Sequence, residues 1–280
     1  VPPPRPPETA ILQWVTKERR GGDPFVALDL PTGLHPAEGH APGAVFSADH
    51  TLALGSVKSG CLRDRALPYV GRLHGVPIDF GVPAPKAAAD FFLPAEAGSL
   101  LRFRPADLHK HSAGTVHLWA GSVSYPGASL LASSGALRSG SGYVRLFADQ
   151  SVAALAPAKL PELLLSPHAD STAPDLEKFQ SRANAVVVGP GLPPSDSLAD
   201  FLSRLLPTSP VPVVLDAGAL DLVADHPDWI ESAKAPIILT PHRGELGRLL
   251  GQKIAERAEA VRLWLDRHPR TILVAKGPHT

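Results

Sequence analysis

The stretch 185-AVVVGPGL-192 decides the fold class of this chain. A short run of small and β-branched apolar residues is followed by a turn in which two glycines flank a proline. Such a run is typical of a strand that is buried on both faces, as in a parallel sheet. We therefore predict a parallel-sheet strand at 185–188. The turn at 189–192 either exposes backbone to a ligand or is a plain connection between strand and helix.

Similar apolar runs recur along the chain, and helical stretches separate the later ones. The predicted strands are residues 25–30, 50–54, 115–120, 143–147, 185–188, 211–216, 237–240 and 271–275. The predicted helices are residues 127–137, 196–206, 245–250 and 255–265. Alternation of this kind predicts an α/β fold, a mostly parallel sheet with helices on both faces. Residues 1–7, nearly all proline, are expected to form an extended tail.

Length and composition exclude several classes of protein. The 280 residues, 44% of them hydrophobic, suffice for two domains without a disulfide framework. Lys plus Arg and Asp plus Glu both count 27, so we expect no nucleic-acid partner. The sequence shows neither an apolar run of membrane-spanning length nor a signal peptide, so we expect no membrane partner. A lone cysteine, Cys61, indicates a reducing compartment, and we expect a cytoplasmic protein.

The stretch 83–111 interrupts the alternation of predicted strands and helices. It contains proline-containing turns and the start of the polar run 104-RPADLHKHSAG-114. We interpret it as a linker and expect a domain boundary near residue 105. The chain contains no methionine, begins with Val1 and ends soon after its last predicted strand. We therefore expect it to be a piece of a longer protein, truncated at its C-terminus.

Ligands of open α/β sheets bind beyond the carboxyl ends of the strands, so the strand ends are the candidate site. Five of the predicted strands are followed by glycine, charge or histidine. These ends are 121-GSVSYPGAS-129, 189-GPGL-192, 216-DAGAL-220, 241-PHRGE-245 and 276-KGPHT-280. Neither GxxxxGK[ST] nor GxGxxG occurs, which excludes a P-loop and a dinucleotide fingerprint.

Each of these ends has a structural as well as a functional interpretation. The helix start at 126–129 can present N–H groups to an anion, or its small residues can simply permit close packing. Asp216 either serves a ligand or caps the strand end. His242 and Glu245 can hold a ligand or a metal-bound phosphate, although a carboxylate also suits the helix dipole. Lys276 either meets phosphate as a point charge or lies in an exposed turn.

The upstream stretch 28-LDLPTG-33 repeats the arrangement on a smaller scale. Asp29 is expected within a buried strand, with Thr32 in the turn beyond it. Lys58 follows the next predicted strand. These residues fit a second, smaller ligand site.

Taken in order, the motifs resemble those of the NAD(P)H-hydrate dehydratase family, which has a ribokinase-like fold. The matching stretches are 109-HKHSAG-114, 121-GSVSYPGAS-129, 135-GALRSGSG-142, 189-GPGL-192, 216-DAGAL-220, 240-TPHRGE-245 and 276-KGPHT-280. The N-terminal part resembles the C-terminal part of the Rossmann-like NAD(P)H-hydrate epimerase domain. Its matching stretches are 28-LDLPTG-33, 48-ADHTLALGSVKSG-60 and 68-PYVGRLHGVPIDFGVP-83. The resemblance implies an epimerase part with linker at 1–103 and a truncated dehydratase domain at 104–280.

The family's chemistry, as the resemblance implies it, is the repair of reduced nicotinamide cofactors that have become hydrated. The epimerase domain interconverts the R and S hydrates of NADH and NADPH, called NADHX and NADPHX. The dehydratase domain uses ADP with Mg²⁺ to phosphorylate the hydroxyl of the S hydrate, after which phosphate leaves. The epimerase domain carries K⁺, and the small-molecule substrates and ADP are the expected partners, with a homo-oligomer compatible with the family.

The resemblance also assigns roles residue by residue. The hydrate would contact Ala128, Gly189 or Gly191, and His242 in the dehydratase domain, and Asp29 in the epimerase part. The nucleotide would lie against Lys276, Gly277, Pro278, His279 and Thr280. Thr32, where the family usually has serine in DIPSG, would be a potassium ligand, and Glu245 would help to hold magnesium. The catalytic base, an Asp of a later GSGD or GTGD motif, is expected beyond Thr280.

Two other functions fit the same residues. One is a ribokinase-like kinase that phosphorylates a small vitamin precursor, and the other is a nucleotide-binding fragment without activity. The adjoining epimerase-like part and His242 within 240-TPHRGE-245 favour the dehydratase.

Overall fold

A computed structural model describes residues 5–18, 23–78, 81, 109, 112–169 and 171–278. The chain divides into two compact units, residues 1–103 (unit 1) and residues 104–280 (unit 2). The predicted linker, residues 83–111, lies outside the described residues apart from His109.

Unit 2 is built on a sheet whose seven described strands have the order β10-β9-β8-β7-β4-β5-β6. All neighbouring strands are parallel. The strands are β4 (Thr115–Trp119), β5 (Tyr143–Asp149), β6 (Leu164–His168), β7 (Ala185–Val188), β8 (Val213–Leu215), β9 (Ile237–Leu239) and β10 (Thr271–Leu273). The order changes direction between β4 and β7, which is the topological switch point where α/β sheets bind ligands.

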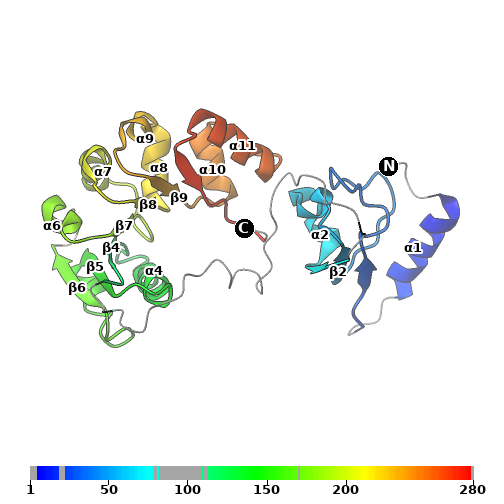
Figure 1. Cartoon of the computed structure of the whole chain (residues 1–280), viewed down its shortest axis with the longest axis horizontal. Helices are drawn as coiled ribbons and strands as arrows, with labels where there is room; N and C mark the ends of the chain where they lie inside the picture. The colour runs from blue at the N-terminus through cyan, green and yellow to red at the C-terminus, as the bar shows by residue number, and fades with distance from the viewer. Residues whose placement is uncertain are drawn as a thin grey trace. The chain divides into compact units, whose positions relative to one another are not determined.

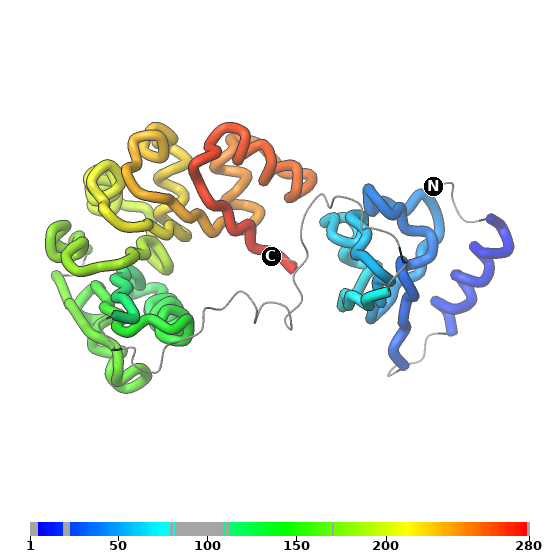
Figure 2. The backbone as a smooth tube through the Cα atoms, in the orientation of Figure 1, coloured from blue at the N-terminus to red at the C-terminus, as the bar shows by residue number. Residues whose placement is uncertain are grey.

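Helices connect the strands of unit 2, whose path runs from green at β4 to red at β10 in Figures 1 and 2. They are α4 (Pro126–Arg138), α5 (Gln150–Ala153), α6 (Leu176–Gln180), α7 (Asp196–Thr208), α8 (Gly218–Asp225), α9 (Asp228–Ser232), α10 (Arg243–Leu250) and α11 (Arg257–Arg267). Ser195 is the N-cap of α7, because its hydroxyl accepts a hydrogen bond from the Leu198 N–H.

Successive side chains of the central strands enter two different hydrophobic clusters, one on each face of the sheet. Leu118 and Leu146 pack in a cluster that includes residues of α4 and α5. Their neighbours Trp119 and Phe147 pack in the larger cluster with residues of α6 and α7. The predicted parallel sheet with helices on both faces is therefore confirmed.

Unit 1 contains a smaller parallel sheet, in which β1 (Val26–Leu28), β2 (His50–Leu54) and β3 (Arg72–Val76) are neighbours in that order. The short helix α2 (Leu67–Val70) and two 3-10 turns precede β3. Their small core includes Leu34, Cys61 and Val70, each at most 2% exposed.

Several features differ from the sequence prediction, and α5, α6, α8 and α9 are helices outside the predicted set. The tail is shorter than expected, because Pro6 begins α1 (Pro6–Glu18) and the Glu8 carboxylate accepts from the Arg5 N–H at 2.9 Å. Strands β3 and β6 lie outside the predicted set. Both are outermost in the described sheets, where a single buried residue in β3 and Pro167 in β6 are tolerated.

Within the described residues, no helix has the length and apolar character needed to cross a bilayer.

Candidate active site

The carboxyl ends of β8, β9 and β10 bring a lysine between two carboxylates. Nζ of Lys276 donates to Oδ1 of Asp216 at 2.7 Å and lies 3.8 Å from Oε2 of Glu245. The Thr240 hydroxyl donates to the same Asp216 oxygen at 2.9 Å, and the Lys276 N–H donates to the Pro241 carbonyl at 2.8 Å. Side chains predicted from three separate strand ends therefore form one cluster at the carboxyl ends of these strands.

His242 and Glu245 form a capping box at the start of α10. Nδ1 of His242 accepts from the N–H groups of Gly244 at 2.9 Å and Glu245 at 3.3 Å, and Oε2 of Glu245 accepts from the His242 N–H at 2.7 Å. Because Nδ1 is an acceptor, the proton of the neutral ring is assigned to Nε2. The His242 side chain is 56% exposed, whereas that of Glu245 is 7% exposed. His242 thus caps the helix, and its Nε2 lies 3.4 Å from Oε1 of Glu245.

The turn at 189–191 packs against the start of α4 and the end of β8 without room for side chains. A Cβ on Gly191, whose φ is 70°, would lie 2.5 Å from the Cβ of Ala128. A Cβ on Gly189, whose φ is 118°, would overlap the carbonyl oxygen of Asp216. The structure therefore brings together Ala128, both glycines and the Asp216–Lys276 pair.

Backbone hydrogen bonds hold the two strand ends on either side of the switch point. The Gly121 N–H donates to the Pro190 carbonyl at 2.7 Å, and the Gly189 N–H donates to the Trp119 carbonyl at 3.2 Å. These bonds fix the 189–191 turn against the loop that precedes α4. A ligand at this point would meet a preformed surface.

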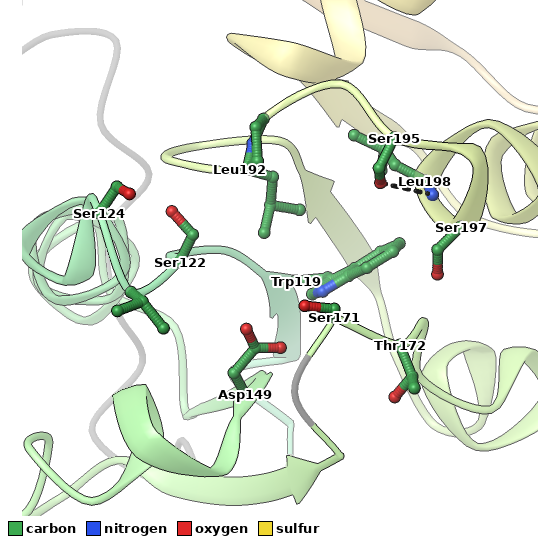
Figure 3. A pocket seen from close by; sticks show the side chains of 12 residues that line it. Trp119, Ser122, Ser124, Asp149, Ser171, Thr172, Leu192, Ser195, Ser197 and Leu198 are labelled. Atoms are coloured by element: carbon green, nitrogen blue, oxygen red, sulfur yellow. Dashed lines mark hydrogen bonds between the residues drawn. The ribbon is translucent and has the colours of Figure 1, made fainter.

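A pocket of about 210 Å³ lies beside this surface, at the carboxyl ends of β4, β5 and β7. Figure 3 shows the Trp119 ring, the Asp149 carboxylate and several hydroxyl groups around it. The Ser122 hydroxyl, also in the lining, is buried and finds no hydrogen-bond partner in the described part of the chain. An indole face with hydroxyl and carboxylate groups suits a flat or sugar-like ligand.

The sequence prediction covers this pocket only in part. Ser122 lies in the quoted stretch 121–129, but Asp149 is outside the predicted set. Asp149 is the last residue of β5, so the same strand-end criterion, applied to this strand, would have found it. Its Oδ1 lies 3.7 Å from Nδ1 of His168. Ser171 and Thr172 also line the pocket, and they come from a loop that carries no sequence signal.

The predicted nucleotide residues follow β10. Gly277 packs against the guanidinium of Arg257, which a Cβ at this position would overlap. Pro278 is the last described residue, and His279 and Thr280 lie outside the described residues.

In unit 1 the candidate residues Asp29 and Lys58 form an ion pair. Asp29 lies just beyond β1 rather than within a strand, because its φ of 70° ends the extended backbone. Oδ1 of Asp29 accepts from the Leu54 N–H at 3.0 Å, and Lys58 also donates to the Leu54 carbonyl at 2.9 Å. Thr32 is exposed in the following turn, where its carbonyl accepts from the Phe46 N–H at 2.9 Å.

The pKa of Asp29 reflects these contacts. Burial by itself raises the pKa of this carboxyl, but the hydrogen bonds from Lys58 and from the Leu54 N–H outweigh it. The pKa of Asp29 therefore lies below its ordinary value, and the side chain is a carboxylate at neutral pH.

A second group in unit 1 has metal-ligand chemistry but not the geometry of a centre. Ligand atoms of His35, Glu38 and His40 lie within 4.8 Å of one another. The rings of His35 and His40 are stacked, with centroids 4.7 Å apart and planes 19° apart. Nearly parallel rings do not aim their in-plane lone pairs at one point, so we assign no metal to this cluster.

The strand order, the switch point and the polar strand ends define unit 2 as a ribokinase-like α/β domain. A ribokinase-like superfamily protein from Enterococcus faecalis shares the fold, with a TM-score of 0.52 and 21% identity, over 62% of this chain and 61% of that chain.

The family model described as NAD(P)H-hydrate dehydratase matches residues 116–280, and the chain belongs to this family. A second model, described as YjeF-related protein N-terminus, matches residues 2–60. The family resemblance predicted from the motifs is therefore confirmed.

Named relatives agree with both matches. Proteins of Gloeobacter violaceus (36% identical, 99% of this chain, 56% of the relative) and Salinibacter ruber (31%, 98% and 53%) are each called a bifunctional NAD(P)H-hydrate repair enzyme Nnr. The chain thus spans about half the length of these curated relatives. Among solved structures, an ADP/ATP-dependent NAD(P)H-hydrate dehydratase from Bacillus subtilis, co-crystallized with ATP and Mg²⁺, is 33% identical. Its TM-score is 0.55 over 68% of this chain and 67% of that chain.

Proposed function

We propose that this chain is part of an enzyme that repairs NADHX and NADPHX, and that unit 2 carries the ADP-dependent dehydration of the S epimer. The observation that carries the proposal is the Lys276 ammonium between Asp216 and Glu245 at the carboxyl edge of the sheet. The cation that we propose to bind phosphate thereby lies at the same ends of the strands as the 189–191 turn. That combination suits a reaction between a nucleotide and a flat ring.

The hydrated ring is proposed to lie against Ala128 and the 189–191 turn, with the Nε2–H of His242 donating to it. Lys276 would bind a phosphate of the nucleotide, whose site continues through Gly277, Pro278, His279 and Thr280. The pocket beside Trp119 would take a further part of the dinucleotide. The buried Ser122 hydroxyl, which lacks a partner within the described residues, supports a ligand hydroxyl there.

The chemistry required of the protein is positioning and charge stabilisation. Hydroxide is a poor leaving group, and transfer of a phosphoryl group from ADP to the hydroxyl oxygen, with loss of the hydroxyl proton, releases AMP and leaves a phosphate ester. The C–O bond then breaks, phosphate leaves with the bonding electron pair, the neighbouring ring carbon loses a proton, and the C=C bond of the dihydronicotinamide ring is restored. Lys276 would offset the negative charge that moves between the phosphates and the hydroxyl oxygen.

The residues also fit a magnesium ion carried by the nucleotide. Carboxylate oxygens are the protein donors that Mg²⁺ takes in phosphoryl-transfer sites. Oε1 of Glu245 lies 3.4 Å from the half-exposed His242 ring and is the oxygen we propose as a ligand. When bound, the ion would neutralise phosphate charge.

Unit 1 is proposed to be the C-terminal part of the epimerase domain, with unit 2 as the dehydratase domain. Its Asp29 carboxylate, with a lowered pKa, would accept a hydrogen bond from the hydrate. The Thr32 hydroxyl is a neutral oxygen of the kind that potassium takes, but one such ligand does not make a site, and we assign no step to the ion. A cytoplasmic location and a homo-oligomeric state stay predictions.

The test is calorimetric titration of ADP into the 280-residue chain and its variants. A charge-assisted contact is worth about 1.5–3 kcal/mol, so Lys276→Gln should weaken ADP binding by roughly ten- to a hundredfold. Lys234→Gln, which removes an exposed lysine elsewhere in unit 2, should leave it unchanged. Equal ADP affinity in the two variants would remove Lys276 from the nucleotide site. A preference for ATP with a vitamin-like alcohol would favour the kinase alternative.

A further inference from the structure

A second pocket of unit 2 lies at the amino ends of the strands, away from the candidate active site. Its volume is about 460 Å³. Thr115, Tyr143 and Leu164 in its lining are the first residues of β4, β5 and β6. The pocket therefore opens at the amino ends of these strands, whereas the candidate active site lies at the carboxyl ends. It takes no part in the chemistry proposed above.

Three cations from different segments line this pocket. Arg145 comes from β5, Lys178 from α6 and Arg182 from the turn after α6. Its described lining contains no carboxylate. Nη1 of Arg145 donates to the neutral Ser166 hydroxyl at 3.1 Å.

Some described cations of unit 2 outside this pocket lie next to a carboxylate. Arg204 pairs with Asp200 at 2.6 Å, and Arg248 pairs with Asp221 at 2.6 Å. Among the described residues, none of the three pocket cations forms such a pair. Their charges therefore add in one place, and a concave surface concentrates the resulting positive potential.

The local structure positions the backbone segments that carry Lys178 and Arg182. The buried His117 ring, 3% exposed, donates from Nδ1 to the Phe179 carbonyl at 2.7 Å, which ties α6 and its Lys178 to β4. Burial lowers the pKa of His117, so the ring is neutral beside the pocket. Arg182 is held in the left-handed region with a φ of 62°, a conformation that favours glycine. A long cationic side chain at such a position points to a use outside the fold itself.

We infer that this pocket binds a diphosphate or triphosphate group. Such groups carry the several negative charges that three cations match, and guanidinium groups bind phosphate oxygens through paired N–H donors. The group can come from inorganic pyrophosphate or from a nucleotide, and the two sources differ in whether the nucleoside adds affinity.

The test is titration of inorganic pyrophosphate into the 280-residue chain that carries Lys276→Gln, which removes the proposed phosphate contact at the other edge. Pyrophosphate should still bind. Arg182→Gly and Lys178→Gln should each weaken this binding by about tenfold, the scale of one charge-assisted contact. Arg138→Gln, an exposed arginine in the last turn of α4, is the matched control and should have no effect.

Arg182→Gly also separates binding from folding. Glycine accepts the left-handed backbone, so the melting temperature should hold or rise while pyrophosphate affinity falls. ADP that binds this pocket more tightly than pyrophosphate would identify a nucleotide as the source, and equal affinities would identify the inorganic group. Loss of pyrophosphate binding with Lys276→Gln alone would overturn the inference. So would a pyrophosphate affinity that Arg182→Gly leaves unchanged.

Discussion

At the scale of single residues, the candidate site uses side chains that also hold the fold. His242 accepts hydrogen bonds from two backbone N–H groups at the start of α10 through Nδ1, and its half-exposed ring places Nε2 3.4 Å from Oε1 of Glu245. The sequence left a structural and a functional role open, and the geometry shows that the structural role is real. A simple deletion of the ring would therefore mix a folding effect with a binding effect.

Two substitutions of His242 separate these effects. His242→Ala removes the cap and should lower the free energy of unfolding by about 1 kcal/mol, whereas His242→Asn can keep a cap. Both should impair binding of the hydrate if Nε2 donates to it. Denaturant unfolding and hydrate binding are the two measurements. Normal hydrate binding by a stable His242→Asn chain would leave the residue with its helix-capping role alone.

The Asp29–Lys58 pair gives a pH-dependent prediction. The folded pKa of Asp29 is lowered, so its contribution to stability is complete above the unfolded pKa of about 3.9 and is lost as the pH falls through the folded value. Lys58→Met should raise the Asp29 pKa, because burial is then opposed only by the Leu54 N–H among the causes named above. An NMR titration of the carboxyl carbon measures the midpoint. The same midpoint with and without Lys58 would contradict the assignment.

At the scale of elements, the turn between β7 and α7 packs directly against the start of α4. The two form one surface because the residues in contact are glycine and alanine. Gly189 and Gly191 both have positive φ values, and each faces backbone or a methyl group at close range. The sequence left a ligand-contacting turn and a plain connection open at 189–191. The structure packs this turn against residues at the ends of two other segments, which no local pattern contains.

A pair of glycine substitutions tests this surface. Gly189→Ala should destabilise unit 2 by more than about 1 kcal/mol, since its φ of 118° is strained for alanine and the Cβ overlaps a carbonyl. Gly135→Ala is the control, because it lies inside α4 with open space around it. It should instead stabilise by about 0.5–1 kcal/mol. Denaturant midpoints measure both, and equal shifts would contradict the packing described.

At the scale of the whole molecule, the chain consists of two units with separate cores. Cys61 is a buried member of the unit 1 core, and burial raises the pKa of its thiol to about 11. It is the single cysteine of the sequence and therefore a specific reporter of this unit.

The thiol should react with a disulfide reagent at pH 8 at least about a hundredfold more slowly than a free cysteine, because so little thiolate is present. Denaturant should restore the rate as unit 1 unfolds. Absorbance of the released thiolate gives both rates. Reaction of the native chain at the free-cysteine rate would show that Cys61 is not buried as described.

The sequence by itself determined the α/β class, because short runs such as 185-AVVV-188 have no polar face and must be buried on both sides of a sheet. It also predicted which strand ends carry chemistry, since glycine, charge and histidine after a buried strand stand out locally.

Tertiary structure alone decided which of these groups meet. Lys276 reaches Asp216 across sixty positions of sequence because β8, β9 and β10 are neighbours in the sheet. Pairing with neighbouring strands also placed the outermost strands β3 and β6, whose sequences are weakly apolar. Strand and helix packing brought Arg145, Lys178 and Arg182 around one pocket. The physical reason is that strand pairing and helix packing act between residues distant in the chain, whereas hydrophobic period and turn chemistry act between neighbours.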